Sequence, residues 1–74
     1  MHLIDASRLL CPMPVIKLQN AVAQLNNNST VQITCTDPGV LHDIPAWATI
    51  NGHKIVRTEH QADKILLTVL VCKA

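Results

Sequence analysis

The spacing of apolar residues changes along the chain and predicts two kinds of element. Between residues 12 and 25 the apolar positions recur every three or four residues, which is the period of a helix with one buried face. The members of this stripe are Val15, Leu18, Val22 and Leu25. Residues 30–37 instead alternate apolar and polar positions, as a half-buried strand does. We therefore predict a helix over 12–25 and a strand over 30–37.

A second helix is predicted to follow this strand directly. Asp37 precedes a proline, and the pair is a helix start signal, with aspartate as the N-cap and proline in the first turn. A ragged apolar stripe then runs to an Asn-Gly stop signal at residues 51–52. Pro45 falls inside the stripe. Because proline lacks an N–H and clashes with the preceding turn, we expect the helix to be kinked or split near Asp43.

Three further strands complete the predicted fold. Residues 2–5 form a short apolar start that we expect at a sheet edge, and 53–59 and 64–72 form two strands joined by a turn. The last strand is almost continuously apolar, which favours a central position in the sheet. The element order β-α-β-α-β-β predicts an α/β fold. We expect one domain, residues 1–74, built as a two-layer sandwich with both helices on one face of the sheet, because short crossovers are right-handed.

The candidate chemistry lies where the first helix begins. Cys11 stands directly before Pro12, Met13 and Pro14. Proline suits the first turn of a helix, so we predict Cys11 as the N-cap, Pro12 at the first helical position and Pro14 at the third. A thiol so placed meets free N–H groups and the positive end of the helix dipole, which favour the nucleophilic thiolate.

These residues carry a resemblance to a known family. The run Asp-Ala-Ser-Arg-Leu-Leu-Cys-Pro-Met-Pro at residues 5–14, Asp-Pro at 37–38 and Asp-Ile-Pro-Ala-Trp at 43–47 resemble the TusA (SirA-like) family of sulfur carriers. The resemblance covers nearly the whole chain. It implies a mixed four-stranded sheet in the order 1-2-4-3. It also implies a sulfurtransferase in which Cys11 accepts a sulfane sulfur as a persulfide and hands it on.

Three residues around the motif are supporting site candidates, each with a plainer alternative. Arg8 stands where family members usually have glycine; it is strained if that position needs a positive φ, and its charge favours a thiolate if it lies near Cys11. The alternative is a solvated surface arginine. Asp37 either caps the second helix or joins the site at the carboxyl ends of the strands, where ligands gather in open sheets. Asp43 has the same two interpretations.

Composition and charge narrow the class of protein. The 74 residues carry a net charge of +1 and one aromatic residue, which argues against a nucleic-acid interface. Three cysteines, an odd number, argue against a disulfide framework. No apolar run reaches bilayer length and no signal-peptide layout is present, so we expect a cytoplasmic protein without membrane insertion. The four histidines fall on different elements and form no ligand pair, so we expect neither a metal nor another cofactor.

The resemblance also implies partners. A sulfur donor of the cysteine desulfurase or rhodanese type would load the carrier, and an acceptor protein would unload it, in tRNA thiolation or another branch of sulfur metabolism. We expect a monomer or a weak dimer. Two other functions stay open: a regulatory or nucleic-acid-binding module, and a thiol redox regulator in which Cys11 pairs with Cys35 or with another protein. The alternation of the 30–37 strand predicts Cys35 as a core residue, which weighs against that pairing.

Overall fold

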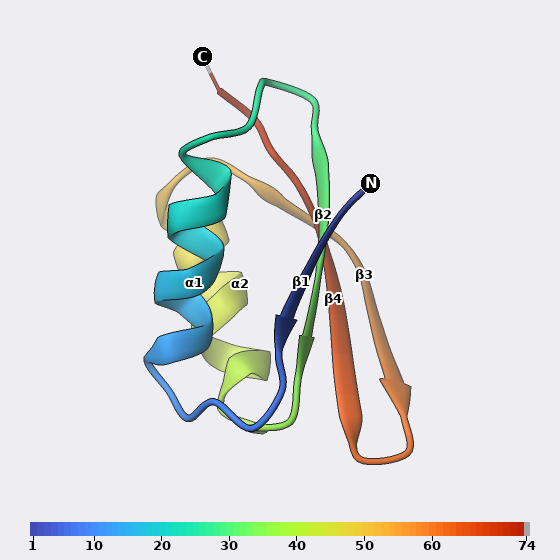
Figure 1. The fold of residues 1–74 in the computed structure, drawn as a ribbon. Coiled ribbons are helices and arrows are strands. Elements are labelled where there is room, and N and C mark those ends of the chain that lie inside the picture. The colour runs from blue at the N-terminus through green and yellow to red at the C-terminus, as the bar shows by residue number, and fades with distance from the viewer. Residues whose placement is uncertain (74) are drawn as a thin grey trace.

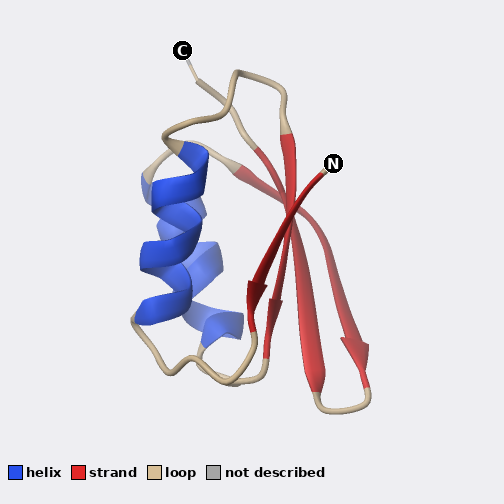
Figure 2. Cartoon of the chain, viewed as in Figure 1, coloured by secondary structure: helices blue, strands red, loops and turns tan. Residues whose placement is uncertain are grey.

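The computed structural model describes residues 1–73, so the last residue of the predicted domain lies outside the described residues. Within this range, two helices lie on one face of a four-stranded sheet, and none lies on the other face (Figure 1). The helices are α1 (Met13–Val22) and α2 (Val40–Ile50); the strands are β1 (His2–Ala6), β2 (Thr30–Cys35), β3 (Lys54–Gln61) and β4 (Lys64–Leu70). Figure 2 shows the helical layer and the sheet edge-on. The predicted two-layer α/β sandwich is confirmed.

The sheet has the order β1-β2-β4-β3, as the family resemblance implied. β1 and β2 are parallel, with Ile4 opposite Ile33, and β4 is antiparallel to both of its neighbours, with Leu67 opposite Ile33. β1 therefore lies at an edge and β4 at the centre, as predicted. Because β1 and β2 are parallel, the loops that follow them leave the sheet at the same end (Figure 1).

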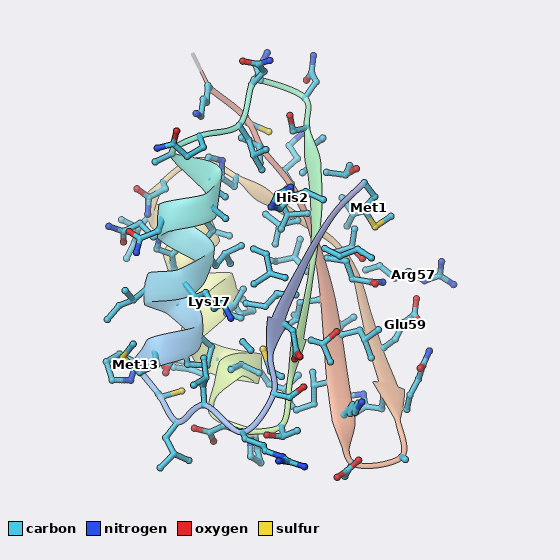
Figure 3. The ribbon with its side chains drawn as sticks, in the orientation of Figure 1. Met1, His2, Met13, Lys17, Arg57 and Glu59 are labelled. Atoms are coloured by element: carbon cyan, nitrogen blue, oxygen red, sulfur yellow. The ribbon has the colours of Figure 1, made fainter. Side chains whose placement is uncertain are left out.

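The core lies between the sheet and the helices and is almost entirely aliphatic. Every second residue of β2 is buried, and Cys35 is fully buried among them, which confirms it as a core residue. Trp47 is the one aromatic member of the core, 9% exposed, and its ring lies 5.1 Å from the ring of His53. On the other side of the sheet the strands carry polar side chains such as the paired Arg57 and Glu59, 2.7 Å apart (Figure 3).

The start of α1 differs from the prediction by one residue. The N-cap is Pro12, so Pro14 occupies the second helical position and Cys11 lies in the preceding turn. Cys11 does not cap the helix, because the Pro12 carbonyl accepts the first helical bond, from the Ile16 N–H at 3.1 Å. The Cys11 N–H donates to the side chain of Asp37. The helix also ends earlier than predicted, at Val22.

The helix α2, like α1, begins later in the sequence than predicted. Its N-cap is Gly39, so the prediction of Asp37 as the N-cap is wrong. A tighter turn precedes the helix, in which the Val40 N–H donates to the Asp37 carbonyl at 3.2 Å. The predicted split near Asp43 does not occur either, because α2 is continuous through Pro45. The carbonyl that Pro45 leaves unbonded belongs to Leu41, which is 41% exposed and so lies on the side of the helix that water reaches.

The last two strands are offset slightly from their predicted bounds. β3 extends to Gln61, two residues beyond the prediction, and Ala62 and Asp63 form the turn. β4 ends at Leu70, two residues before the prediction. A bulge between Ile55 and Arg57 shifts the register of β3 against β4.

Arg8 adopts the left-handed backbone conformation, with φ of 66°. The loop holds it there, because the Arg8 N–H donates to the Thr36 hydroxyl at 2.8 Å and the Leu9 N–H donates to the Ala6 carbonyl at 3.3 Å. A side chain in this region clashes with its own backbone, whereas glycine does not. The expectation of a strained arginine at this position is confirmed.

We therefore expect Arg8→Gly to stabilise the fold by about 1 kcal/mol, because glycine removes the strain of the β-carbon. Urea unfolding followed by circular dichroism measures the change. Arg8→Ala is the matched control, since it removes the guanidinium but keeps the β-carbon. If both variants had the same free energy of unfolding, the β-carbon would not be the source of strain.

Candidate active site

The site is built by the two loops at the carboxyl ends of the parallel strands. Cys11 belongs to the β1–α1 loop, and Asp37 and Gly39 belong to the β2–α2 loop. A single carboxylate joins them. The Cys11 N–H donates to Asp37 Oδ2 at 2.9 Å, and the Gly39 N–H donates to Asp37 Oδ1 at 3.0 Å. These two N–H groups, Cys11 first, hold the pKa of Asp37 below its usual value, so the carboxylate stays charged.

Gly39 lets the thiol approach the second helix. A β-carbon at this position would lie 3.0 Å from Cys11 Sγ and 3.4 Å from Asp37 Oδ1. The thiol therefore packs against the backbone at the start of α2, across the site from its own helix. Gly39 was not among the predicted site residues. Its signal was the Asp-Pro-Gly run, which puts a residue without a side chain directly at a helix start.

The electrostatics of the thiol are opposite to the prediction. Asp43 and Asp37 raise the pKa of Cys11 to about 12: the first cause is a hydrogen bond with the Asp43 carboxylate, then burial of the thiol, then the hydrogen bond and charge of Asp37. This direction is opposite to the one that the helix dipole alone predicts, so the Cys11 thiolate stays a prediction. The prediction counted the dipole of α1 and the charge of Arg8. It did not count the two carboxylates, Asp37 of the β2–α2 loop and Asp43 of α2, and Arg8 is not among the groups that shift this pKa.

The other predicted site residues have distinct places. Pro12 caps α1, Met13 is its first residue and 47% exposed, and Pro14 is buried beneath them. Figure 3 shows Met13 projecting from the end of α1. Arg8 is exposed and lines a polar depression of about 470 Å³ together with Asp5, Ser7, Thr36, Asp63 and Lys64. Cys11, Asp37 and Asp43 are thus brought together, and Arg8 lies apart from them.

A shallow groove of about 450 Å³ adjoins the site between the two helices. Its lining comprises Pro12 and Val15 of the first helix region and His42, Asp43, Ala46, Trp47, Ile50 and Asn51 of the second. Most of this lining is apolar, and Asp43 is its one carboxylate. The groove and the thiol therefore share Asp43.

The remaining chemistry of residues 1–73 is sparse. The three cysteines are free: Cys11 and Cys72 are half-buried and Cys35 is buried. These residues contain no group of three or more histidine, cysteine, aspartate or glutamate side chains that could hold a metal ion. Within the same part of the chain, neither helix is long and apolar enough to cross a membrane.

The fold and the site define a small α/β protein with a half-buried thiol, that of Cys11, set between two loops. Comparison with known proteins gives the family: the model described as Sulfurtransferase TusA matches residues 2–73. The sulfur carrier protein TusA of Pseudomonas aeruginosa is 34% identical over 64 residues, covering 86% of this chain and 81% of that protein. YrkI of Bacillus subtilis is 30% identical over 60 residues, covering 81% and 80%. This chain belongs to the TusA family.

A solved structure supports the fold independently. The crystal structure of a SirA-like protein from Desulfitobacterium hafniense matches with a TM-score of 0.86, covering 99% of this chain and 100% of that one. The two sequences are 24% identical, so this structural similarity supports the fold alone.

Gly39→Ala tests the packing of the thiol. Gly39 has φ of −58°, a helical value that alanine adopts freely, and such a change by itself stabilises a protein by about 0.5–1 kcal/mol. The contact with Cys11 Sγ should reverse the sign, so we expect a loss of about 1 kcal/mol. In a Cys11→Ala background, which lacks Sγ, the same change should stabilise. Urea unfolding of the four proteins gives the interaction energy, and equal effects in both backgrounds would contradict the contact.

Asp37→Asn tests the junction between the loops. Since the folded pKa of Asp37 lies below its unfolded value near 3.8, the carboxylate stabilises the fold above that pH, and its contribution is lost as pH falls through the folded pKa. The variant should therefore have a lower urea midpoint of unfolding than wild type at neutral pH. The difference between the two midpoints should become smaller in acid. Asp63→Asn, the same change in the β3–β4 turn, is the control. If the difference between the midpoints did not depend on pH, the charge of the Asp37 carboxylate would not be what stabilises the contact between the loops.

Proposed function

We propose that this chain is a sulfur carrier that holds a sulfane sulfur as a persulfide on Cys11. The observation that carries the proposal is the placement of Cys11: its thiol is half-buried but reachable, and its backbone is fixed to the neighbouring loop by Asp37. Cys35, by contrast, is fully buried in the core. Membership of the TusA family supports the assignment, since the Pseudomonas aeruginosa relative is a sulfur carrier protein.

The proposed reaction transfers one sulfur atom to the Cys11 thiol and then from it. Cys11 attacks the outer sulfur of a donor persulfide, the donor leaves as a thiol, and Cys11 then carries the persulfide. An acceptor thiol next attacks the outer sulfur and releases Cys11. The forward and reverse steps are chemically alike, so an open site that two proteins reach in turn suits a carrier.

The surface around Cys11 fits protein partners. Several apolar side chains near the ends of the two helices are exposed: Leu10, Met13, Ile16, Leu41 and Ile50. Apolar residues of this size contribute to contacts between proteins when a partner covers them. We infer a sulfur donor and a sulfur acceptor protein as successive partners. A relay that passes persulfides between free thiols needs a reducing compartment, so we place the carrier in the cytoplasm.

Intact-mass measurement tests this function. After incubation with a cysteine desulfurase and cysteine, or with a rhodanese and thiosulfate, the wild-type chain should gain one sulfur atom that reductant removes. Cys11→Ser should gain none. Cys72→Ser, which removes the other half-buried thiol, should load as fully as wild type.

The controls give the result a single interpretation. A gain that survives in Cys11→Ser but disappears in Cys72→Ser would move the carrier function to Cys72. No gain with either donor would argue against the proposed function.

A further inference from the structure

We propose that Thr36 is a positioning residue for sulfur transfer, which holds the β1–α1 loop in the conformation that places Cys11 against Gly39. The inference rests on the proposed carrier function and extends its site to a residue that acts through Arg8. Three observations carry it: the hydrogen bond between Arg8 and the Thr36 hydroxyl, the left-handed conformation of Arg8, and the short segment that joins Arg8 to Cys11.

Two neighbouring residues of the β2–α2 loop hold the β1–α1 loop at two points. The Arg8 N–H donates to Thr36 Oγ1 at 2.8 Å, and the Cys11 N–H donates to Asp37 Oδ2 at 2.9 Å. The two loops leave the sheet at the same end, where these bonds join them (Figure 1). A loop held at a single point can turn about it, whereas two points also fix its orientation. Thr36 therefore supplies the point of attachment that Asp37 alone does not.

The Thr36 bond opposes the strain of Arg8. Arg8 has φ of 66°, and this left-handed region is unfavourable for a residue with a β-carbon. The cost is similar in size to the net contribution of one hydrogen bond, so the bond decides which conformation is populated. The other backbone bond of this turn, from the Leu9 N–H to the Ala6 carbonyl, is longer, at 3.3 Å. Without the Thr36 hydroxyl we therefore expect Arg8 to move toward negative φ.

A change at Arg8 has to be absorbed by the segment that carries the thiol. On one side of this segment, Ala6 is paired with β2 in the sheet. On the other side, the fully buried side chain of Leu18 anchors α1 in the core. Between these two anchors Leu10 is 73% exposed, so little packing holds it in place. Residues 9–12, which include the thiol, therefore take up the rotation.

The thiol has little room to move without losing its contact. A β-carbon at Gly39 would lie 3.0 Å from Cys11 Sγ, so the sulfur packs directly against the backbone at the start of α2. Displacement of a reacting group by about 1 Å is enough to slow a reaction strongly. A partner that docks on the surface around the site therefore meets the sulfur in one place only while the loop is held.

Thr36 acts through the backbone of Arg8 and not through its charge. The Arg8 side chain lines the polar depression of about 470 Å³, together with Thr36 and Lys64, and Cys11 is not part of that lining. The bond to Thr36 uses only the backbone N–H, which every residue except proline supplies. Arg8→Ala therefore removes the guanidinium and leaves the Thr36 bond in place. This separates the inference from an electrostatic effect of Arg8 on the thiol.

The test measures single-turnover sulfur transfer from a persulfidated cysteine desulfurase to Cys11, at saturating donor and with each variant folded by circular dichroism. Thr36→Val keeps the shape of the side chain and removes its hydroxyl, so transfer should be slower by about 10-fold. Thr36→Ser restores the hydroxyl and should retain most of the transfer. Thr34→Val is the matched control and should leave transfer unchanged, since the Thr34 hydroxyl forms no hydrogen bond within residues 1–73.

A second background makes the readout specific to the strain of Arg8. In Arg8→Gly the strain is absent, because glycine populates positive φ about as readily as negative φ. Thr36→Val should therefore slow transfer by only about 2-fold in this background, against about 10-fold in the wild-type background. A threonine that only stabilises the fold would change the transfer rate by the same factor in both backgrounds.

The outcomes separate this inference from the carrier function. Normal transfer by folded Thr36→Val, or equal losses in the two backgrounds, overturns the inference and leaves the carrier function intact. If Thr36→Val does not fold, Thr36→Ala takes its place: slow transfer by the alanine variant beside normal transfer by Thr36→Ser supports the inference, and equal transfer overturns it. If wild type gains no sulfur, the carrier function fails and this inference fails with it.

Discussion

The site depends on one carboxylate that accepts hydrogen bonds from two loops. The parallel pairing of β1 and β2 sends both loops to the same end of the sheet. The bonds of Asp37 to Cys11 and Gly39, together with the bond of the Arg8 N–H to Thr36, fix one loop against the other. With the loops joined, the thiol lies against a residue that has no side chain, and Asp43 follows one helical turn later. The sequence separation of 26 residues between Cys11 and Asp37 makes this junction a property of the fold.

Two electrostatic effects compete at the thiol. The start of α1 presents about half a positive charge and favours the thiolate, as in reactive cysteines of other proteins. Asp43 and Asp37 act in the opposite direction and raise the pKa of the Cys11 thiol. A carrier of this kind is protected from indiscriminate reaction, because its sulfur becomes nucleophilic only when its proton has a place to go. Selectivity then lies in the partner that presents a persulfide to the site.

Local features of the sequence predicted most of the fold. The change from a helical to a strand period located the elements. The resemblance to a family with glycine at the position of Arg8 raised the alternative of a positive φ, which the structure shows. The errors have both local and distant causes. The start of α2 is set by short-range bonds of Asp37 to Gly39 and Val40, whereas Cys11 is held by the side chain of Asp37, 26 residues away. Asp37 and Asp43 were both candidates for the site, but spacing alone did not show that they meet the same thiol.

The central claim is that Asp43 and Asp37 keep the Cys11 thiol protonated. A titration of the Cys11 β-carbon by NMR, in wild-type protein labelled at cysteine, measures this without chemical modification. We predict that the carbon shows no transition through the neutral range and titrates only at strongly basic pH, in keeping with a pKa of about 12. A transition below the value of an ordinary cysteine, about 8.5, would show that the helix dipole prevails and would contradict the account.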